Sequence, residues 1–377
     1  GIILHTGLGR AAWPECVVDS MAADLKGYVT LAVDAATGKR QGRDACIEYL
    51  MTELTGAEAA TVVVNNAAGT LIALAALCGD KEVVVSRGQL VEIGGEFRLP
   101  DVMAQSGARM VEVGATNRTH LRDYERAISP ETAALFRAHP SNYRIVGFTE
   151  EVPMDQLATL AHARGLLAID DLGAGALVDL ERFGLPHEPT VRESLAAGAD
   201  VVLFSADKLI GASQGGLIVG KKDCIDRIRR HPLARALRVD KSCLMALERT
   251  LALFRDPERL VREHPTYRML ATPLDQLEAR AGRLAAAIAQ AAPNVATEIV
   301  AGVGYLGSGS LPMHELPAVL VALTAPPLTA EQLAQRLRTD EACVFARIER
   351  DRVLLDVRTM TDAQTALVAG ALGRIAR

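Results

Sequence analysis

The twenty residues from Val201 to Gly220 read VVLFSADKLIGASQGGLIVG. Two apolar runs, each of the length of a buried strand, enclose a polar and glycine-containing segment that carries Lys208. Lysine is strongly hydrated and is rarely buried without a partner or a chemical purpose. The stretch therefore predicts two strands of a sheet core, with a lysine just beyond the end of the first.

The chain before this stretch repeats the pattern of short apolar runs bounded by polar residues. The predicted strands are Ala60–Val64, Val83–Val85, Met110–Val113, Ile145–Phe148, Leu166–Ile169, Val201–Phe204 and Gly216–Val219. Segments of helical periodicity lie between them, at Tyr124–Ala134, Met154–Arg164 and Val191–Ala197. Continuous apolar strands that alternate with helices predict an α/β fold whose parallel sheet is covered on both faces.

The pattern changes after about residue 250. Thr272–Ala292 has the periodicity of one long amphipathic helix, and shorter helices are predicted at Ala330–Leu337 and Asp362–Ile375. Alternating stretches at Ala318–Ala322 and Val353–Val357 are typical of half-buried strands. We predict an N-terminal segment over residues 1–26, a large domain over 27–255 and a smaller α+β domain over 256–377.

The composition limits the classes of function. The 377 residues carry 41 Lys and Arg against 46 Asp and Glu, a net charge of −5, so the whole chain has no general attraction to nucleic acid, although local patches are possible. Six scattered cysteines without a CxxC pair predict reduced thiols in a cytoplasmic protein and no metal site. No apolar run reaches the roughly 18 residues of a membrane span.

Three polar motifs follow predicted strands, where open α/β sheets bind their ligands. The small residues of Asn65–Thr70 suit either a phosphate at a helix N-terminus or an ordinary turn. Asp170 and Asp171 suit a cation, a protonated ring nitrogen or a helix cap. Lys208 is either a surface lysine or an amine that forms Schiff bases.

In this order the three motifs resemble those of fold-type-I enzymes that use pyridoxal 5′-phosphate (PLP), which are aspartate-aminotransferase-like. The resemblance implies a mostly parallel central sheet and a smaller C-terminal α+β domain. It implies that Lys208 forms the Schiff base and that Asp170, with Asp171 as the second choice, contacts the pyridine nitrogen. The other cofactor contacts that it implies are Asn66, Ala67, Ala68 and Ser205 for the phosphate, Gln89 against the ring and Asn142 for the 3′-oxygen.

Longer blocks along the whole chain resemble bacterial selenocysteine synthase, the L-seryl-tRNA(Sec) selenium transferase family. They include LHTGLGRA (4–11), EVGATNRTH (112–120), DKLIGASQGGLIVGKK (207–222) and HPLARALRVDK (231–241). The resemblance implies a PLP-dependent conversion of seryl-tRNA(Sec) to selenocysteinyl-tRNA(Sec) through an aminoacrylate, with Lys208 as the base and selenophosphate as the donor. It also implies that Arg10, Arg235 and Arg238 bind the selenophosphate anion, and that the assembly is a homodimer or a larger ring of dimers.

The sequence departs from the family pattern in two ways. Gly7 stands where the family usually has Asn, and the family's N-terminal tRNA-binding domain precedes the point at which this sequence begins. The sequence is therefore either a trimmed synthase or a stand-alone relative. The alternative function is that of a PLP-dependent β-eliminating lyase on a small amino acid or amino sugar phosphate. Arg358 distinguishes the two, because a lyase would use an arginine for a free α-carboxylate that a seryl ester lacks.

Overall fold

The structure is a computed structural model, and it describes residues 1–94 and 97–375. The chain divides into two compact units. The larger unit holds residues 6–266 and 308–312, and the smaller unit holds residues 1–5, 267–307 and 313–377. Each unit has its own hydrophobic core.

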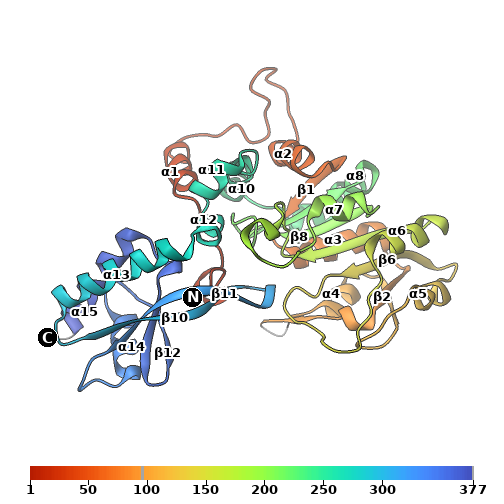
Figure 1. Ribbon diagram of the computed structural model, residues 1–377. Coiled ribbons are helices and arrows are strands. Elements are labelled where there is room, and N and C mark those ends of the chain that lie inside the picture. Colours follow the sequence, from red (N-terminus) through yellow and green to blue (C-terminus); the bar gives the residue numbers. More distant parts are fainter. Residues whose placement is uncertain (95–96, 376–377) are drawn as a thin grey trace. The chain divides into compact units, whose positions relative to one another are not determined.

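The larger unit is built on a seven-stranded sheet with the order β1-β9-β8-β7-β6-β2-β5 (Figure 1). All neighbouring pairs are parallel except those of β9, which runs antiparallel to both β1 and β8. This confirms the predicted mostly parallel α/β sheet. The strands are β1 (Ala59–Val63), β2 (Glu82–Ser86), β5 (Arg109–Val113), β6 (Thr132–Ala138), β7 (Leu167–Gly173), β8 (Val201–Ser205) and β9 (Gly216–Gly220).

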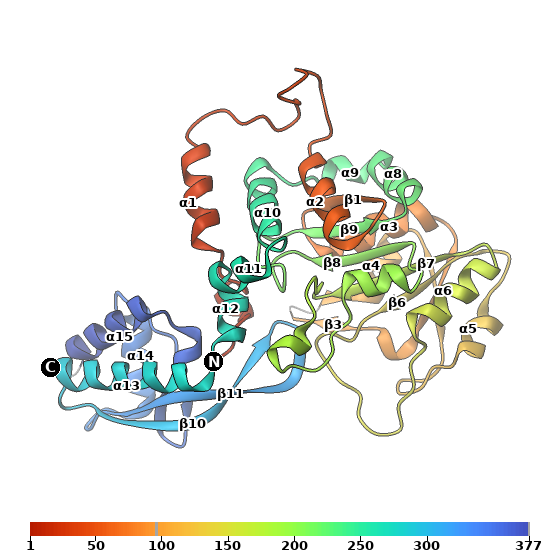
Figure 2. The ribbon, with the colours of Figure 1, turned by 45° about the horizontal axis from the view of Figure 1, so that its top comes forward.

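Helices cover both faces of this sheet, because its strands are apolar on both sides. On one face α3 (Asn66–Cys78), α4 (Leu99–Gln105) and α8 (Lys222–Arg230) bury their apolar residues in one continuous cluster with the strands. On the opposite face α6 (Met154–Ala163) packs on β6 and β7, and α7 (Val191–Ala196) packs on β8 (Figure 2). The unit also contains α1 (Glu15–Asp24), α2 (Ala45–Thr55), α5 (Leu121–Ala127), α9 (Leu233–Ala236), α10 (Lys241–Leu253), α11 (Pro257–Glu263), the short strands β3 (Glu92–Ile93) and β4 (Phe97–Arg98), and the 3-10 turns Thr6–Leu8, Arg87–Gln89 and η3 (Leu180–Phe183).

Two predicted elements of this unit are wrong. The helix predicted over Tyr124–Ala134 ends at Ala127 as α5, and its last residues belong to β6. The strand predicted at Ile145–Phe148 is an irregular segment in which Val146 and Phe148 are 79% and 87% exposed. β6 has the sequence TAALFRA, whose alanines and leucine favour helices, but its burial between β2 and β7 makes it a strand.

The smaller unit has a four-stranded sheet of order β10-β11-β13-β12, against which long helices pack. The predicted long helix is present as α13 (Leu274–Ala291), and the predicted C-terminal helix as α15 (Asp362–Ile375). Leu277, Leu284 and Ile288 lie on one face of α13 and enter the core at helical spacing. The remaining elements are α12 (Pro265–Ala271), β10 (Ala296–Gly307), β11 (Ser310–Thr324), α14 (Ala330–Thr339), β12 (Arg347–Glu349), β13 (Arg352–Asp356) and the 3-10 turn Val357–Thr359.

Candidate active site

A cavity of about 220 Å³ lies in the larger unit at the carboxyl ends of β6, β7 and β8. This is the position at which open α/β sheets bind ligands. Its polar lining comes from the N-terminus of α3, the segment after β6, the end of β7 and the β8–β9 connection. The polar lining residues are Arg10, Asn65, Asn66, Thr70, His139, Ser141, Asp171, Ser205, Asp207, Lys208 and Gln214.

Lys208 lies in the connection between β8 and β9 and lines the cavity, although its residue is only 7% exposed. A hydrogen bond of 2.9 Å from the Ala206 N–H to the Gly215 carbonyl closes this connection into a compact loop. Burial lowers the pKa of Lys208, and the nearby positive charge of Arg10 lowers it further. A larger fraction of Lys208 is therefore the neutral, nucleophilic amine than in an exposed lysine.

Arg10 reaches the same cavity from the N-terminal part of the larger unit, far from Lys208 in sequence. Its guanidinium forms an ion pair with Asp207, the neighbour of Lys208, and Asp207 is itself 9% exposed. The charge of Asp207 acts to raise the pKa of Lys208, against burial and Arg10. Arg10 and Asp207 therefore shift the pKa of Lys208 in opposite directions.

Of the two adjacent acids of β7, Asp171 is the one that lines the cavity. Its Oδ1 accepts hydrogen bonds from Asn66 Nδ2 at 2.8 Å and from the Gly173 N–H at 3.0 Å, and its Oδ2 accepts one from Thr70 Oγ1 at 2.9 Å. Burial raises the pKa of Asp171, whereas these hydrogen bonds and the charge of Lys208 act to lower it. These contacts hold the Asp171 carboxyl group in one orientation beside the cavity.

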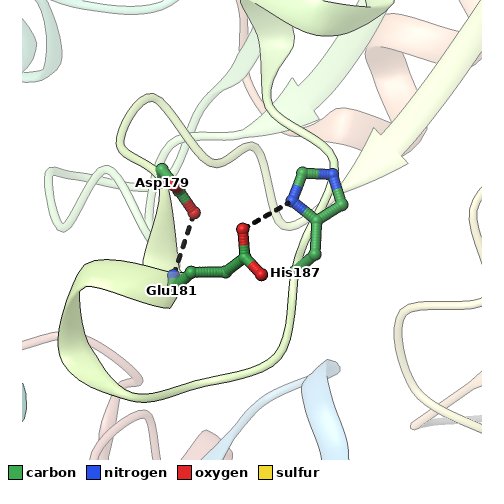
Figure 3. Close-up of side chains that lie close together, drawn as sticks. All are labelled: Asp179, Glu181 and His187. Atoms are coloured by element: carbon green, nitrogen blue, oxygen red, sulfur yellow. Dashed lines mark hydrogen bonds and ion pairs between the residues drawn. The ribbon is translucent and has the colours of Figure 1, made fainter.

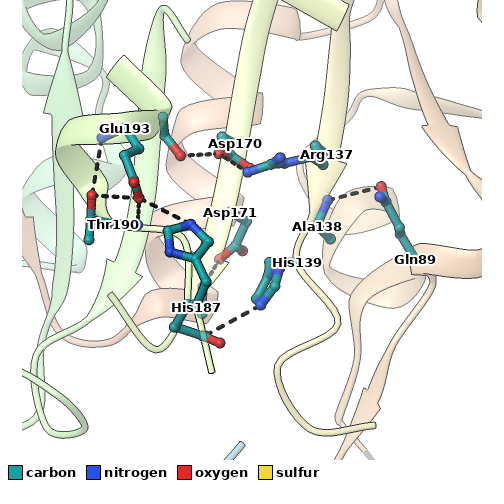
Figure 4. A network of polar contacts seen from close by, with 12 residues as sticks. Gln89, Arg137, Ala138, His139, Asp170, Asp171, His187, Thr190 and Glu193 are labelled. Atoms are coloured by element: carbon teal, nitrogen blue, oxygen red, sulfur yellow. Dashed lines mark hydrogen bonds and ion pairs between the residues drawn. The ribbon is translucent and has the colours of Figure 1, made fainter. Parts of the chain in front are cut away.

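Asp170 is on the other face of the sheet, because successive residues of a strand point in opposite directions. Its two oxygens accept hydrogen bonds from Arg137 at 2.7 and 2.6 Å, and Oδ2 also accepts one from Ser194 Oγ at 2.5 Å (Figure 4). Asp170 is fully buried and does not line the cavity. The structure thus corrects the expectation for Asp170: the acid of β7 that lines the cavity is the second choice, Asp171.

The N-terminus of α3 faces the cavity through Asn66 and Ala67. Asn65 caps the helix, because its Oδ1 accepts a hydrogen bond of 2.8 Å from the Ala68 N–H, so that Ala68 is buried behind the turn and does not line the cavity. The first N–H groups of a helix have no acceptor within the helix. A Cβ atom on Gly216 would lie 2.2 Å from the Asn65 carbonyl oxygen, so only glycine allows β9 to begin so close to this turn.

Of the other predicted cofactor contacts, the structure places Ser205 in the cavity lining but not Gln89 or Asn142. Gln89 is buried, and its Oε1 accepts a hydrogen bond of 3.2 Å from the Ala138 N–H (Figure 4). Asn142 Nδ2 donates to the Glu92 carbonyl at 3.0 Å, and Ser141 lines the cavity in its place.

Arg235 and Arg238 do not line this cavity. Both are exposed, on α9 and just after it, and Arg238 lines a second cavity of about 240 Å³ together with Arg43 and Arg229. The charge of Arg43, and to a smaller degree that of Arg235, lowers the pKa of Arg238. The structure therefore brings these arginines near one another, and brings only Arg10 of the predicted anion contacts to Lys208.

Sequence reasoning missed His139 and Ser141, which line the cavity directly after β6. The sequence signal that could have identified them is their position at the carboxyl end of a buried strand. That strand, β6, was not predicted, because its first residues were assigned to a helix. Thr70 lies in the predicted phosphate turn, but its contact with Asp171 has no sequence signal, because it joins residues 101 positions apart.

The Arg10→Gln substitution is expected to raise the pKa of Lys208, because it removes a cation and leaves the Asp207 charge unpaired. At a given pH below that pKa, less of the amine is neutral, so cofactor-free protein should react more slowly with pyridoxal. At high pH, where Lys208 is neutral in both proteins, the rates should converge. Visible absorbance followed from about pH 7 to about pH 10 measures the profile. Arg255→Gln, which removes an exposed pair with Glu53, is the control, and an unchanged profile for Arg10→Gln would contradict the prediction.

A second group of titratable side chains lies on the surface of the larger unit (Figure 3). Asp179 Oδ1 accepts a hydrogen bond of 2.9 Å from the Glu181 N–H, and His187 Nδ1 is 3.8 Å from Glu181 Oε2. All three residues are exposed, and their contacts with one another already account for the arrangement. We therefore assign no metal to this group.

Two solved structures share the fold. A D-glucosaminate-6-phosphate ammonia-lyase superimposes over 98% of this chain and 93% of its own, with a TM-score of 0.66 and 24% identity. A serine palmitoyltransferase from S. paucimobilis superimposes over 99% of this chain and 86% of its own, with a TM-score of 0.51 and 13% identity. Among the residues that the structure describes, no helix is both long and apolar enough to cross a membrane.

Other known proteins are more similar to this chain in sequence than these two structures are. The family model described as L-seryl-tRNA selenium transferase matches residues 1–361. The L-seryl-tRNA(Sec) selenium transferase of Nitratidesulfovibrio vulgaris is 50% identical over 373 residues, which are 99% of this chain and 80% of that protein. The protein of the same name from Desulfotalea psychrophila is 48% identical, with the same coverage of each chain. This chain is therefore a member of the L-seryl-tRNA selenium transferase family.

Proposed function

We propose that this protein converts seryl-tRNA(Sec) to selenocysteinyl-tRNA(Sec), with PLP as cofactor and selenophosphate as the selenium donor. The observation that carries the proposal is the buried Lys208 in a cavity with Asp171 and the N-terminus of α3, in a chain whose relatives have this name. Family members at this level of identity over 99% of the chain support the reaction class.

The residues of the cavity fit PLP. An amine with a lowered pKa suits its aldehyde, a buried carboxylate suits its pyridine nitrogen, and the free N–H groups of α3 with Ser205 suit its phosphate. Asn66 Oδ1 is buried without a hydrogen-bond partner among the described residues, so the cavity retains an unused acceptor. Bound PLP would supply an aldehyde that condenses with amines and a ring that accepts an electron pair.

The residues of this chain then have distinct tasks. Lys208 holds the cofactor and afterwards accepts and returns the Cα proton of the seryl group as a general base. Asp171, fixed by Asn66 and Thr70, would hold the pyridine nitrogen of the cofactor through its carboxyl group. Arg10 supplies a guanidinium for the selenophosphate anion. Arg235 and Arg238 act on the same anion only if they reach the cavity of a second copy of this chain, which agrees with a homo-oligomer.

Arg358 favours an esterified substrate over a free amino acid. Its Nη1 donates to the carbonyls of Met269 and Thr272 at 2.7 and 3.0 Å, and its Nη2 donates to the Pro317 carbonyl at 2.7 Å. The residue is 6% exposed, so both terminal nitrogens are bound within the smaller unit rather than held ready for an α-carboxylate. A seryl ester on tRNA has no free α-carboxylate and needs no such arginine.

We expect purified protein loaded with PLP to form selenocysteinyl-tRNA from seryl-tRNA(Sec) and selenophosphate, as measured by transfer of radioactive selenium to the tRNA fraction. Free L-serine should give no selenocysteine under the same conditions, because Arg358 is already engaged. Release of ammonia from a small amino acid or amino sugar phosphate, without product on tRNA, would instead establish the lyase.

A further inference from the structure

The cavity is also lined by an imidazole, that of His139, which pairs with a buried carboxylate and to which the reaction above gives no task. His139 directly follows β6, and its Nε2 is 3.3 Å from Oε1 of Glu188, which lies in the loop between η3 and α7. His139 lines the cavity together with Lys208 and Asp171. His139 and Asp171 are both drawn in Figure 4. The pair therefore joins a buried loop residue to the place where substrate and cofactor meet.

Glu188 is 5% exposed, and a buried carboxylate is costly unless it is paired. Among residues 1–94 and 97–375, the side chain that pairs with it is that of His139. The charge of Glu188 also acts to raise the pKa of Lys208, which places it within electrostatic reach of the amine. Glu188 is thus fixed beside the reacting groups, with the imidazole between it and the cavity.

The geometry leaves one ring nitrogen of His139 for a ligand. An imidazole has two ring nitrogens, and Nε2 is the one that lies 3.3 Å from Oε1 of Glu188. No hydrogen bond joins Nδ1 to another of the described residues. The backbone is held in place by a hydrogen bond of 2.8 Å from the His139 N–H to the Asp171 carbonyl. Nδ1 is therefore free to exchange a proton with an atom that enters the cavity.

We propose that His139, oriented by Glu188, donates the proton that lets the β-hydroxyl of the seryl group leave as water. This inference rests on the proposed function. The Cα proton goes to Lys208, the electron pair of that C–H bond forms the Cα–Cβ double bond, and the Cβ–O bond breaks with its pair on oxygen. The Nδ1 proton of His139 completes the water. His139 is a catalytic residue in this step, and Glu188 is a positioning residue.

A protonated leaving group is needed for hydroxide but not for chloride, and this difference tests the proposal. His139→Gln should slow the reaction of seryl-tRNA(Sec) by about 10²–10⁴-fold. The same variant should react with β-chloroalanyl-tRNA(Sec) within about threefold of the unchanged protein. Glu188→Gln should show a smaller loss with the seryl substrate only. His187→Gln, an exposed neighbour of Glu188, is the matched control and should leave both rates unchanged.

A measurement that needs no turnover tests whether Glu188 orients the His139 ring. In nitrogen-15 NMR spectra of the cofactor-free protein, the His139 Nε2 resonance should shift in Glu188→Gln and stay in place in His187→Gln. If His139→Gln slows both substrates equally, or slows neither because Lys208 returns the proton, the proposal is wrong. If the unchanged protein reacts with neither aminoacyl-tRNA, the proposed function itself fails, which is a different outcome.

Discussion

The Lys208→Ala substitution is expected to abolish covalent attachment of PLP and to lower the turnover of seryl-tRNA(Sec) by more than about 10³-fold. Two tasks are proposed for Lys208, attachment of the aldehyde and movement of the Cα proton, and alanine performs neither. The residue is buried in the cavity lining, with its pKa lowered by burial and by Arg10. No other lysine lines the cavity among the described residues, so none is placed to replace it.

Borohydride reduction followed by peptide mass spectrometry measures the attachment directly. In the unchanged protein the cofactor mass should appear on the peptide that contains Lys208, and in the Lys208→Ala variant it should be absent. Lys222→Ala, which removes an exposed lysine paired with Asp226 on α8, should attach the cofactor and turn over as the unchanged protein does. Attachment at another lysine in the unchanged protein would remove Lys208 from the site.

The position of Lys208 at the end of a buried strand was predictable from the sequence, because the local signals are strong. The runs VVLFS and GLIVG are apolar on both faces, so a sheet core is the structure that buries them, and Lys208 must then lie at a strand end. The turn at Asn65–Thr70 was also predictable from neighbouring residues, because Asn65 caps α3 through the N–H of Ala68, three residues away.

The parts that sequence reasoning missed depend on contacts between distant residues. A strand that is buried on both faces has no polar alternation, so nothing in LAIDDLG shows which of Asp170 and Asp171 faces α3. The choice becomes visible only through Arg137 and Ser194 on one side and Asn66 on the other. β6 was hidden for a related reason: its composition favours a helix, and its neighbouring strands override that preference.

The two adjacent acids should respond to the same substitution in opposite ways. Asp171→Asn is expected to lower turnover by about 10²–10³-fold, because it removes the carboxyl group that we propose for the pyridine nitrogen of the cofactor. Its effect on the free energy of unfolding should be small, because asparagine can retain hydrogen bonds to Asn66, Thr70 and Gly173, and because burial already penalises the Asp171 charge.

Asp170→Asn leaves the guanidinium of Arg137, whose side chain is 14% exposed, without its anionic partner. Breaking a buried ion pair by removal of one partner costs about 3–5 kcal/mol, so the midpoint of urea unfolding should fall markedly. Protein that remains folded should keep most of its activity, because Asp171 is unchanged. Steady-state kinetics and urea titration of both variants decide the assignment. If Asp170→Asn lost activity without stability while Asp171→Asn stayed active, Asp170 would be the acid of β7 that acts in the cavity, and the orientation assigned to β7 would be wrong.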